Sequence, residues 1–450
     1  MAEGMRYGKL EIAVTSRFNW IYSDQGSGAN RAVAFYTPAL SSVDVQQGWK
    51  VLAHVGRPNW TTIDRESKVI IARGVNTSDE MLKPPTRFDL IWRDTGSGGK
   101  YGCAVWRPIP PTGYVSLGDV VTAGDPPPAA VVACVRKTVV DGRSYVREAE
   151  IGKSIWSDQG SGTTFGDVEV WKIEPPTYPD DSIERLLLGA DAFVAGTRYG
   201  VKPDRTVHVL DLPALIVKKP EPTRPVMTSH SVPEQETLKV VDRAVTVPCT
   251  VIKDPGKTAD WQVTNSPFYT LERRVNYYRQ MFYDNSGGSV DQPNSQSITT
   301  GVSTTESEEF SKRTSVTVSA SVGVEIKAFT ASVETSVTTE LGYTSRYDVT
   351  VLKQKTDTWS MVTPARHSTA LWSPRHEIVP IRKNGDVVGG QGGLKFDTDV
   401  RVFTQFPPAP GASSARVLVN GVEEQEDPKV QPFGESESTI PEALSSIIAS

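Results

Sequence analysis

Three related stretches of sequence decide the fold of this chain: WIYSDQGSG at residues 20–28, IWRDTGSG at 91–98 and IWSDQGSG at 155–162. Each is followed by a short apolar alternation that ends in an aromatic residue, at 33–36, 103–106 and 168–171. Apolar residues at every second position are typical of half-buried strands, and Asp-x-Gly-Ser-Gly supplies the residues that tight turns need. This repeated strand–turn–strand unit predicts a pseudo-threefold, all-β domain.

The turn motif allows two functions. It can simply form hairpins, because Asp caps a turn and glycine supplies positive φ. It can also bind sugar or Ca²⁺, because carboxylate and hydroxyl oxygens beside open backbone groups suit both ligands. A phosphate loop is disfavoured because Gly99-Lys100 lacks the upstream glycine and the hydroxyl residue, and a dinucleotide fingerprint because no helix is expected after the turn. The candidate receptor- or glycan-binding residues are Asp24, Ser27, Asp94, Ser97, Asp158 and Ser161.

A second pattern lies at residues 314–341, TSVTVSASVGVEIKAFTASVETSVTTEL. Apolar residues occupy even positions up to Ile326 and odd positions from Phe329, the change of phase that a hairpin needs to keep one face apolar. We therefore expect Ile326 to lie opposite Phe329. The apolar face would comprise Val316, Val318, Ala320, Val322, Val324, Ile326, Phe329, Ala331, Val333, Val337 and Leu341. The hydroxyl-rich face would carry Glu325, Lys327, Glu334 and Glu340.

The length of this hairpin suits a membrane. A tilted spanning strand needs about 9–11 residues, which each arm provides. A single hairpin would leave its edge backbone groups unsatisfied in lipid, so several copies would have to close a barrel. The apolar face would then contact lipid and the charged face would line the lumen. An ordinary long hairpin in a β-sandwich is the alternative.

Composition narrows the classes of function. The 450 residues carry 48 Lys+Arg and 53 Asp+Glu, a balance that gives no reason to expect nucleic acid as a partner. No apolar run approaches the length of a transmembrane helix, and no signal peptide is visible at the start. Cys103, Cys134, Cys249 and the five histidines fit no metal-ligand spacing, and no nucleophile–base motif stands out. We expect no cofactor, no metal and no enzymatic activity.

The domain organisation follows from these patterns. We predict a repeat domain at 1–215, a proline-rich linker at 216–236, a second β domain at 237–410 and a polar tail at 411–450. Five prolines between residues 213 and 236, without periodicity, mark the boundary.

The first half carries a family resemblance. The string from Phe88 to Gly98, followed by VWRPIPPTGYVSLGDVV at 105–121, resembles the vacuolar protein sorting-associated protein sixty-two family over roughly residues 1–215. Its threefold pattern is similar to a β-prism, a shape that implies receptor recognition. The first copy departs from the pattern, with Tyr36-Thr-Pro in place of Trp-Arg-Pro.

The second half resembles a toxin family. A Ser/Thr-rich hairpin flanked by Ser/Thr tracts at 297–305 and 335–339 is similar to aerolysin-type β-pore-forming toxins. Within that family, its pattern most resembles the epsilon-toxin and mosquitocidal-toxin branch. The resemblance implies an elongated β domain in a soluble bacterial insecticidal protein that acts outside the producing cell, at the target-cell membrane. Its partners would be a host cell-surface glycan or glycoprotein, membrane lipid, and further copies in a homo-oligomeric ring. The alternative is a lectin-like or structural β protein that never enters a membrane.

Overall fold

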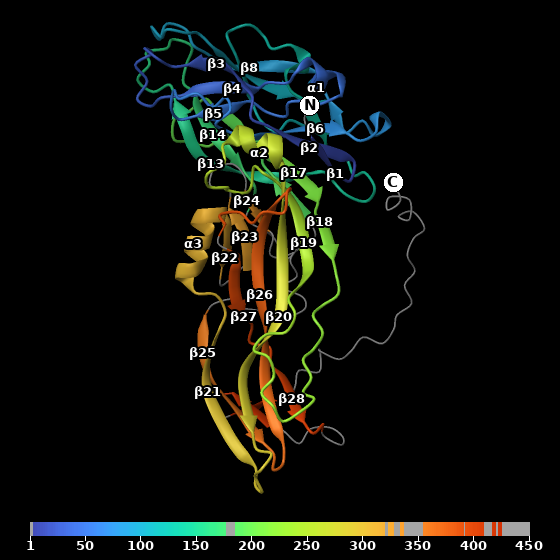
Figure 1. Ribbon diagram of the computed structural model, residues 1–450. Helices are drawn as coiled ribbons and strands as arrows, with labels where there is room; N and C mark the ends of the chain where they lie inside the picture. Colours follow the sequence, from blue (N-terminus) through green and yellow to red (C-terminus); the bar gives the residue numbers. More distant parts are fainter. Residues whose placement is uncertain are drawn as a thin grey trace.

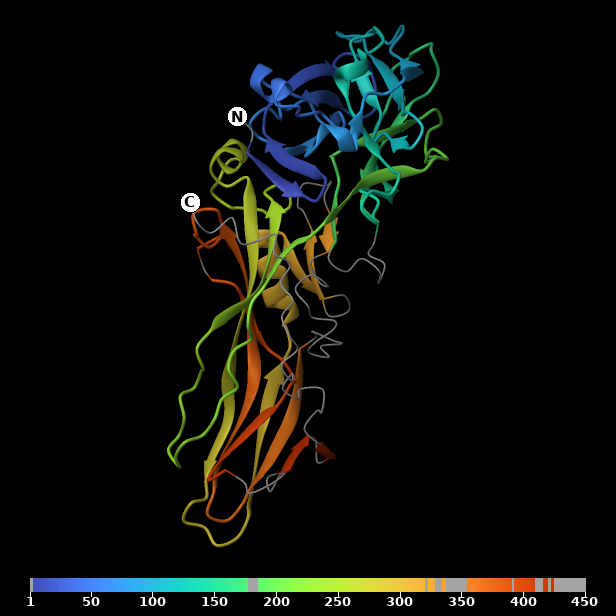
Figure 2. The same ribbon diagram turned by 90° about the vertical axis from the view of Figure 1, so that its right-hand side faces the viewer.

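The computed structural model describes residues 3–176, 185–319, 323–327, 334–336, 354–390, 392–408, 416–419 and 422–424. The N-terminal half forms a head at one end, and the rest forms a long body of extended strands (Figures 1 and 2). The predicted all-β fold is confirmed, since the α-helices of the described residues are short: α1 (Ser42–Gln46), α2 (Ala259–Asn265) and α3 (Thr304–Thr314), with single 3₁₀ turns at Thr77–Asp79 and Ala129–Val131. In the part of the chain that is described, no helix has the length and apolar character to cross a membrane.

The head contains three equivalent groups of antiparallel strands around the three turns. In each group the turn joins two paired strands and a third strand pairs with the second. The strands are β3 (Phe18–Ser23), β4 (Ala34–Pro38) and β5 (Val55–Arg57); β8 (Arg87–Arg93), β9 (Ala104–Ile109) and β11 (Val120–Thr122); and β13 (Val146–Ser157), β14 (Glu169–Glu174) and β16 (Phe193–Gly196). The register shifts at the same place before each turn, between Trp20 and Tyr22, Leu90 and Trp92, and Ser154 and Trp156.

The three copies share one apolar core. Tyr22, Trp92 and Trp156, each two residues before a turn aspartate, are buried together with Phe35 and Phe193. Further strands enlarge each group: β1 (Gly4–Tyr7), β2 (Leu10–Thr15) and β6 (Val69–Gly74); β7 (Leu82–Lys83), β10 (Tyr114–Val115) and β12 (Cys134–Arg136); and β15 (Arg185–Leu188) and β17 (Val207–Pro213), which extend the β13 sheet.

The body is built on one very long strand pair, β20 (Phe268–Asp284) and β26 (Ser368–Arg382). Their sheet also contains β18 (Leu215–Lys218), β19 (Val240–Pro248), β27 (Leu394–Asp397) and β28 (Val402–Phe406). A second sheet has the order β21 (Gln292–Thr300), β25 (Lys355–Thr363), β29 (Arg416–Val419) and β30 (Val422–Glu424). The strands β29 and β30 fall within the segment predicted to be a polar tail, and β29 pairs with β25.

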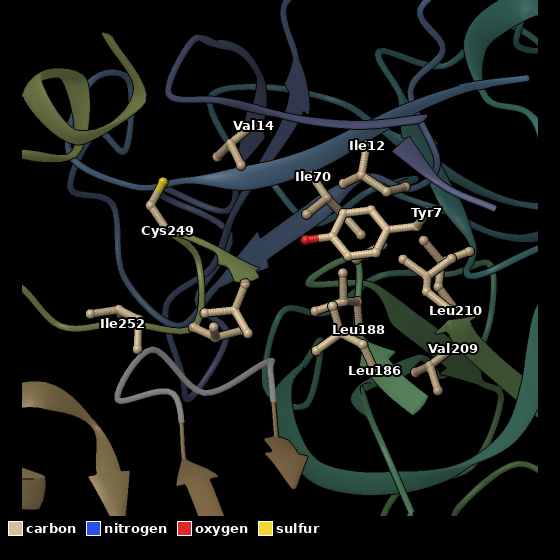
Figure 3. Packing of buried hydrophobic residues seen from close by; sticks show 14 of the residues in the cluster. Tyr7, Ile12, Val14, Ile70, Leu186, Leu188, Val209, Leu210, Cys249 and Ile252 are labelled. Carbon is tan, nitrogen blue, oxygen red and sulfur yellow. The ribbon is translucent and has the colours of Figure 1, made fainter. Parts of the chain in front are cut away.

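Head and body meet through a continuous apolar cluster. Cys249 and Ile252 of the body belong to the same apolar cluster as Tyr7, Leu186 and Leu188 of the head (Figure 3). The Lys68 side chain reaches across this joint and donates to the carbonyl of Cys249 and to Oε1 of Gln262, each at 2.7 Å. Burial lowers the pKa of this lysine. The two parts therefore share buried surface.

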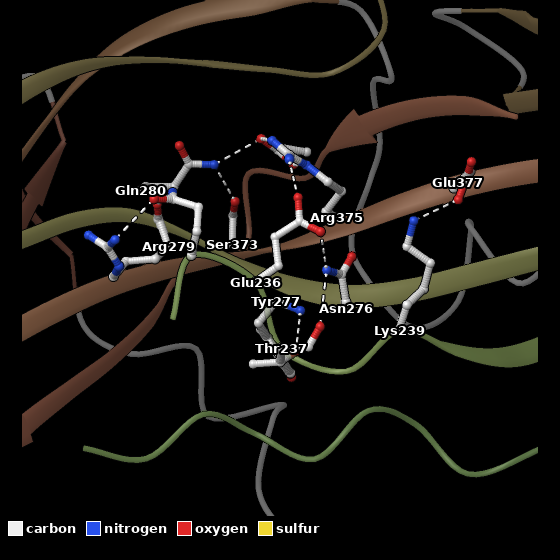
Figure 4. Close-up of polar contacts among 12 residues, drawn as sticks. Glu236, Thr237, Lys239, Asn276, Tyr277, Arg279, Gln280, Ser373, Arg375 and Glu377 are labelled. Atoms are coloured by element: carbon white, nitrogen blue, oxygen red, sulfur yellow. Dashed lines mark hydrogen bonds and ion pairs between the residues drawn. The ribbon is translucent and has the colours of Figure 1, made fainter. Parts of the chain in front are cut away.

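The predicted linker lies against the body. After β18 pairs with β19, residues 219–239 form a strap that runs along the long sheet and returns (Figures 1 and 2). On the returning arm, Glu236 forms an ion pair with Arg375 at 3.0 Å, and the amide of Arg279 donates to the carbonyl of Gln235 (Figure 4). The proline-rich composition thus produces an extended segment that is docked along the body sheet.

Candidate functional site

The three turns are joined into a ring by backbone hydrogen bonds. In each copy, the donor is the backbone N–H of the residue six positions after the turn aspartate. The acceptor is the backbone carbonyl of the residue directly after the aspartate of another copy. The bonds run from Asn30 to Gln159 at 2.8 Å, from Lys100 to Gln25 at 2.9 Å and from Thr164 to Thr95 at 2.8 Å. Every copy donates once and accepts once, so the ring closes.

The predicted ligand-binding side chains of the turns hold the turns together. Each serine oxygen accepts from the amide two residues further on, in the pairs Ser27–Ala29, Ser97–Gly99 and Ser161–Thr163, at 3.0–3.3 Å. The carboxylates of Asp24 and Asp158 accept from the amides of Val33 and Val168 at 2.9 and 2.8 Å. Asp24 and Asp158 are buried, whereas Asp94 is half-buried. These bonds account for the repeated motif by hairpin chemistry, and ligand binding by these residues stays a prediction.

A second set of contacts connects the copies through aromatic side chains. Trp156 Nε1 donates to Asp24 Oδ2 at 2.8 Å, and the Tyr22 hydroxyl donates to Asp94 Oδ2 at 3.1 Å. Burial, followed by the nearby negative groups, raises the pKa of Tyr22 and keeps it a donor. The equivalent side chain of the second copy, Trp92, donates instead to the carbonyl of Gly166 at 2.9 Å. The third aspartate therefore lacks the contact that the first two receive.

Aromatic and apolar side chains flank the three turns, and all of them except the half-buried Tyr101 are exposed. Trp20 and Leu90 lie four residues before a turn aspartate, and Tyr101 and Phe165 lie seven residues after one. The rings of Trp20 and Tyr101 meet edge-on, with their centroids 4.7 Å apart. Leu90 and Phe165 are exposed. Trp60 is also half exposed, and its Nε1 donates to Asp24 Oδ1 at 2.6 Å. We call these five residues the turn-ring patch. The sequence alone does not single out these residues, because they lie outside the turn motif and Trp20 and Tyr101 belong to different copies.

The hairpin region differs from the prediction. Residues 316–319 form β22 (Val316–Ser319) and residues 323–327 form β23 (Gly323–Lys327), with Val316 opposite Ile326. β24 (Glu334–Ser336) then pairs with β23, and Thr335 lies opposite Ile326. The predicted pairing of Ile326 with Phe329 is therefore wrong for this structure. The predicted residues Ala320, Val322, Phe329, Ala331, Val333, Val337, Glu340 and Leu341 lie outside the described residues.

The physical reason is the stability of short sheets in water. An isolated two-stranded hairpin is marginally stable, whereas three strands packed on a helix give more burial. The first arm folds back on itself, and its even-numbered residues still oppose each other, as in Val318 with Val324. The helix α3 leads directly into this small sheet, and Val316 is fully buried.

Two strands bracket the region. β21 ends at Thr300, β25 begins at Lys355, and Thr300 lies opposite Lys355 at the end of a continuous nine-residue ladder. Residues 301–354 therefore leave and re-enter the body at one point. Hydroxyl pairs stabilise the ladder, with Ser295 and Ser360 oxygens 2.7 Å apart and Thr299 and Thr356 oxygens 2.9 Å apart.

One group of contacts in the body brings Ser, His and Asp side chains together, but their order differs from that of a hydrolytic triad. His230 Nδ1 lies 2.9 Å from Ser368 Oγ, and that hydroxyl donates to Asp284 Oδ1 at 2.6 Å. A hydrolytic triad needs the histidine between the other two residues, whereas here serine is in the middle. Within the described ranges, no group of three or more His, Cys, Asp or Glu side chains could hold a metal ion.

Two family models match the chain. The model described as vacuolar protein sorting-associated protein 62 matches residues 2–195, in the head. The model described as Insecticidal Crystal Toxin, P42 matches residues 243–367, which include β20, β21 and β25. The resemblance of the first half to the sorting-associated family is thus confirmed, and the toxin resemblance of the second half is confirmed as a match to an insecticidal toxin family.

Two solved toxin structures are similar to parts or most of the chain. GNIP1Aa from Chromobacterium piscinae is 25% identical over 43% of this chain, with a TM-score of 0.33, and the chain spans about a third (34%) of its length. Cry35Ab1 is 12% identical over 90% of this chain and 91% of its own, with a TM-score of 0.31. At TM-scores this low, neither likeness identifies a shared fold. A search of curated proteins gives no match.

Proposed function

We propose that the chain is an insecticidal pore-forming toxin. Its head binds a glycan or glycoprotein on the target-cell surface, several copies assemble into a ring, and residues 314–341 of each copy form a β-barrel in the membrane. The observation that carries the insecticidal assignment is the match of residues 243–367 to the insecticidal crystal toxin family. Those residues include the whole amphipathic segment 314–341 together with the strands on either side of it.

The β21–β25 ladder supports the pore-forming step. Because residues 301–354 leave and return at one end of this ladder, they can change their own pairing without breaking the long β20–β26 pair. The conversion requires residues 316–326 to straighten from the β22–β23 hairpin into one arm. An arm of that length reaches across the hydrocarbon core when tilted.

The turn-ring patch supports surface recognition by the head. Aromatic and apolar side chains that stay exposed together mark contact surfaces more often than isolated ones do. Rings of Trp and Tyr provide a large flat area with a polar edge, which suits both sugars and protein side chains. We therefore assign receptor contact to the exposed patch beside the turns and assign the turn side chains to holding it in place.

A disulfide lock tests the pore-forming step. Cysteines at Thr317 and Glu325, which lie opposite each other on β22 and β23, would prevent residues 316–326 from straightening. We expect the oxidised double variant to bind target membranes but release no dye from them, and we expect a reducing agent to restore release. The matched control places cysteines at Ser295 and Ser360, opposite each other on β21 and β25, where the lock should leave release unchanged.

The result separates the proposal from its alternatives. Full dye release by the oxidised Thr317–Glu325 variant would contradict insertion of this segment. Binding without any release by the unmodified protein, in the presence or absence of protease, would instead favour a lectin-like binding protein.

A further inference from the structure

The head compensates its buried carboxylates in two ways. Asp119 is paired with Arg107 and Arg205 at 3.2 and 3.3 Å, and arginines also pair with Asp211. Asp24 instead receives two indole N–H groups, from Trp60 and Trp156. Both arrangements fill the lone pairs of a carboxylate that water cannot reach.

Asp158 is different, although it is the third-copy equivalent of Asp24. Its Oδ1 accepts from the Val168 amide at 2.8 Å and from the Tyr199 hydroxyl at 2.7 Å. Its Oδ2 is buried without a hydrogen-bond partner, and the whole residue is 1% exposed. The aromatic donor that would serve it by analogy, Trp92, is bound to Gly166. Leaving a buried acceptor unsatisfied costs on the order of 1–3 kcal/mol, more for a charged group.

A second carboxylate lies beside it. Asp167 directly precedes Val168, and the equivalent positions before Val33 and Cys103 are Ala32 and Gly102. Burial raises the pKa of Asp158, and the charge of Asp167 adds to the rise. Burial and the hydrogen bond to Asp158 raise the pKa of Tyr199, with a further contribution from a hydrogen bond to Asp167. The Tyr199 hydroxyl donates to Asp158, and the charge of Asp167 lies near enough to raise the pKa of both groups; among the three copies only the third has an aspartate at this position.

We propose that the third turn of the head binds a divalent cation of the Ca²⁺ type, with Asp158 Oδ2 as the buried ligand and Asp167 as the exposed one. Hard cations of this class take carboxylate oxygens and complete their coordination with water. Asp167 is exposed, so the ion would enter from solvent. The site is independent of membrane insertion, because it lies in the head and involves no residue of the body.

Terbium binding by the full-length protein tests this site. Tb³⁺ replaces Ca²⁺ at oxygen sites, and the nearby rings of Tyr199 and Trp92 would sensitise its emission. After treatment with EDTA and its removal, we expect a saturable Tb³⁺ signal that CaCl₂ displaces. Asp167→Asn should weaken binding about tenfold or more. Asp125→Asn, at an exposed carboxylate elsewhere in the head, is the matched control and should bind as the unmodified protein does.

Two outcomes would overturn the proposal. One is the absence of a saturable signal from the unmodified protein at millimolar CaCl₂ or micromolar Tb³⁺. The other is equal binding by the Asp167→Asn variant. Thermal unfolding with and without CaCl₂ distinguishes a further possibility, that Asp158 simply carries a proton. In that case acid would raise the midpoint of unfolding and CaCl₂ would not, whereas a bound cation raises it at neutral pH.

Discussion

At the scale of single residues, equivalent aspartates should respond to substitution in opposite directions. Asp24→Asn replaces one of the two oxygens that accept indole N–H groups with an NH₂ donor, and we expect the free energy of unfolding to fall by about 1–3 kcal/mol. Asp158→Asn keeps the oxygen that accepts from Val168 and Tyr199 and removes a buried charge. Urea unfolding at pH 7 in EDTA measures both changes.

The sign for Asp158 follows from linkage. Its pKa is raised in the folded state, so its ionised form opposes folding above the unfolded pKa, and this penalty disappears as the pH falls through the folded pKa. Asp158→Asn should therefore leave stability at pH 7 unchanged or raised, and should flatten its dependence on pH in the acid range. A loss as large as that of Asp24→Asn would show that the second oxygen of Asp158 has a partner.

At the scale of elements, the charges predicted to line the proposed pore would set its ion selectivity. Glu325, Glu334 and Glu340 outnumber Lys327 in every copy, and a ring of carboxylates raises the local concentration of cations. We expect K⁺ to be preferred over Cl⁻, more strongly at low salt. Glu334→Lys should shift the reversal potential under a KCl gradient towards anions, whereas Asp125→Lys in the head should not. An anion-selective unmodified pore would place these residues on the lipid face.

The same elements show what sequence can predict. Local patterns were sufficient for the three turns, because Asp, Ser and Gly act within a few residues, as the bond from Ala29 to Ser27 illustrates. The pairing of β22 with β23 was missed because alternation predicts which face of a sheet a residue lies on, but not which residue lies opposite it. Phe329 and Thr335 are both odd-numbered positions, so either one opposite Ile326 is compatible with the alternation. The turn-ring patch was also missed, since Trp20 and Tyr101 meet only through the threefold packing of the head.

At the scale of the whole molecule, head and body should unfold together. Their shared apolar cluster makes separation costly, although the proline-rich segment predicted two independent units. We expect a single calorimetric transition for the full-length protein. Lys68→Met, which leaves the carbonyl of Cys249 and the amide oxygen of Gln262 without this donor, should lower the midpoint, whereas Lys50→Met at an exposed site should not. Two transitions in the unmodified protein would contradict this coupling.

The closed ring of backbone bonds among the turns also limits how such a head can arise and change. Each copy gives its amide to one neighbour and its carbonyl to the other, so a lone copy cannot saturate itself and the direction of the cycle is fixed. A dimer or a tetramer of the unit would need a different angle between neighbours to close. The number of repeats is therefore set by the turns themselves, because the loss or gain of one repeat would leave an amide and a carbonyl of the ring without their partners.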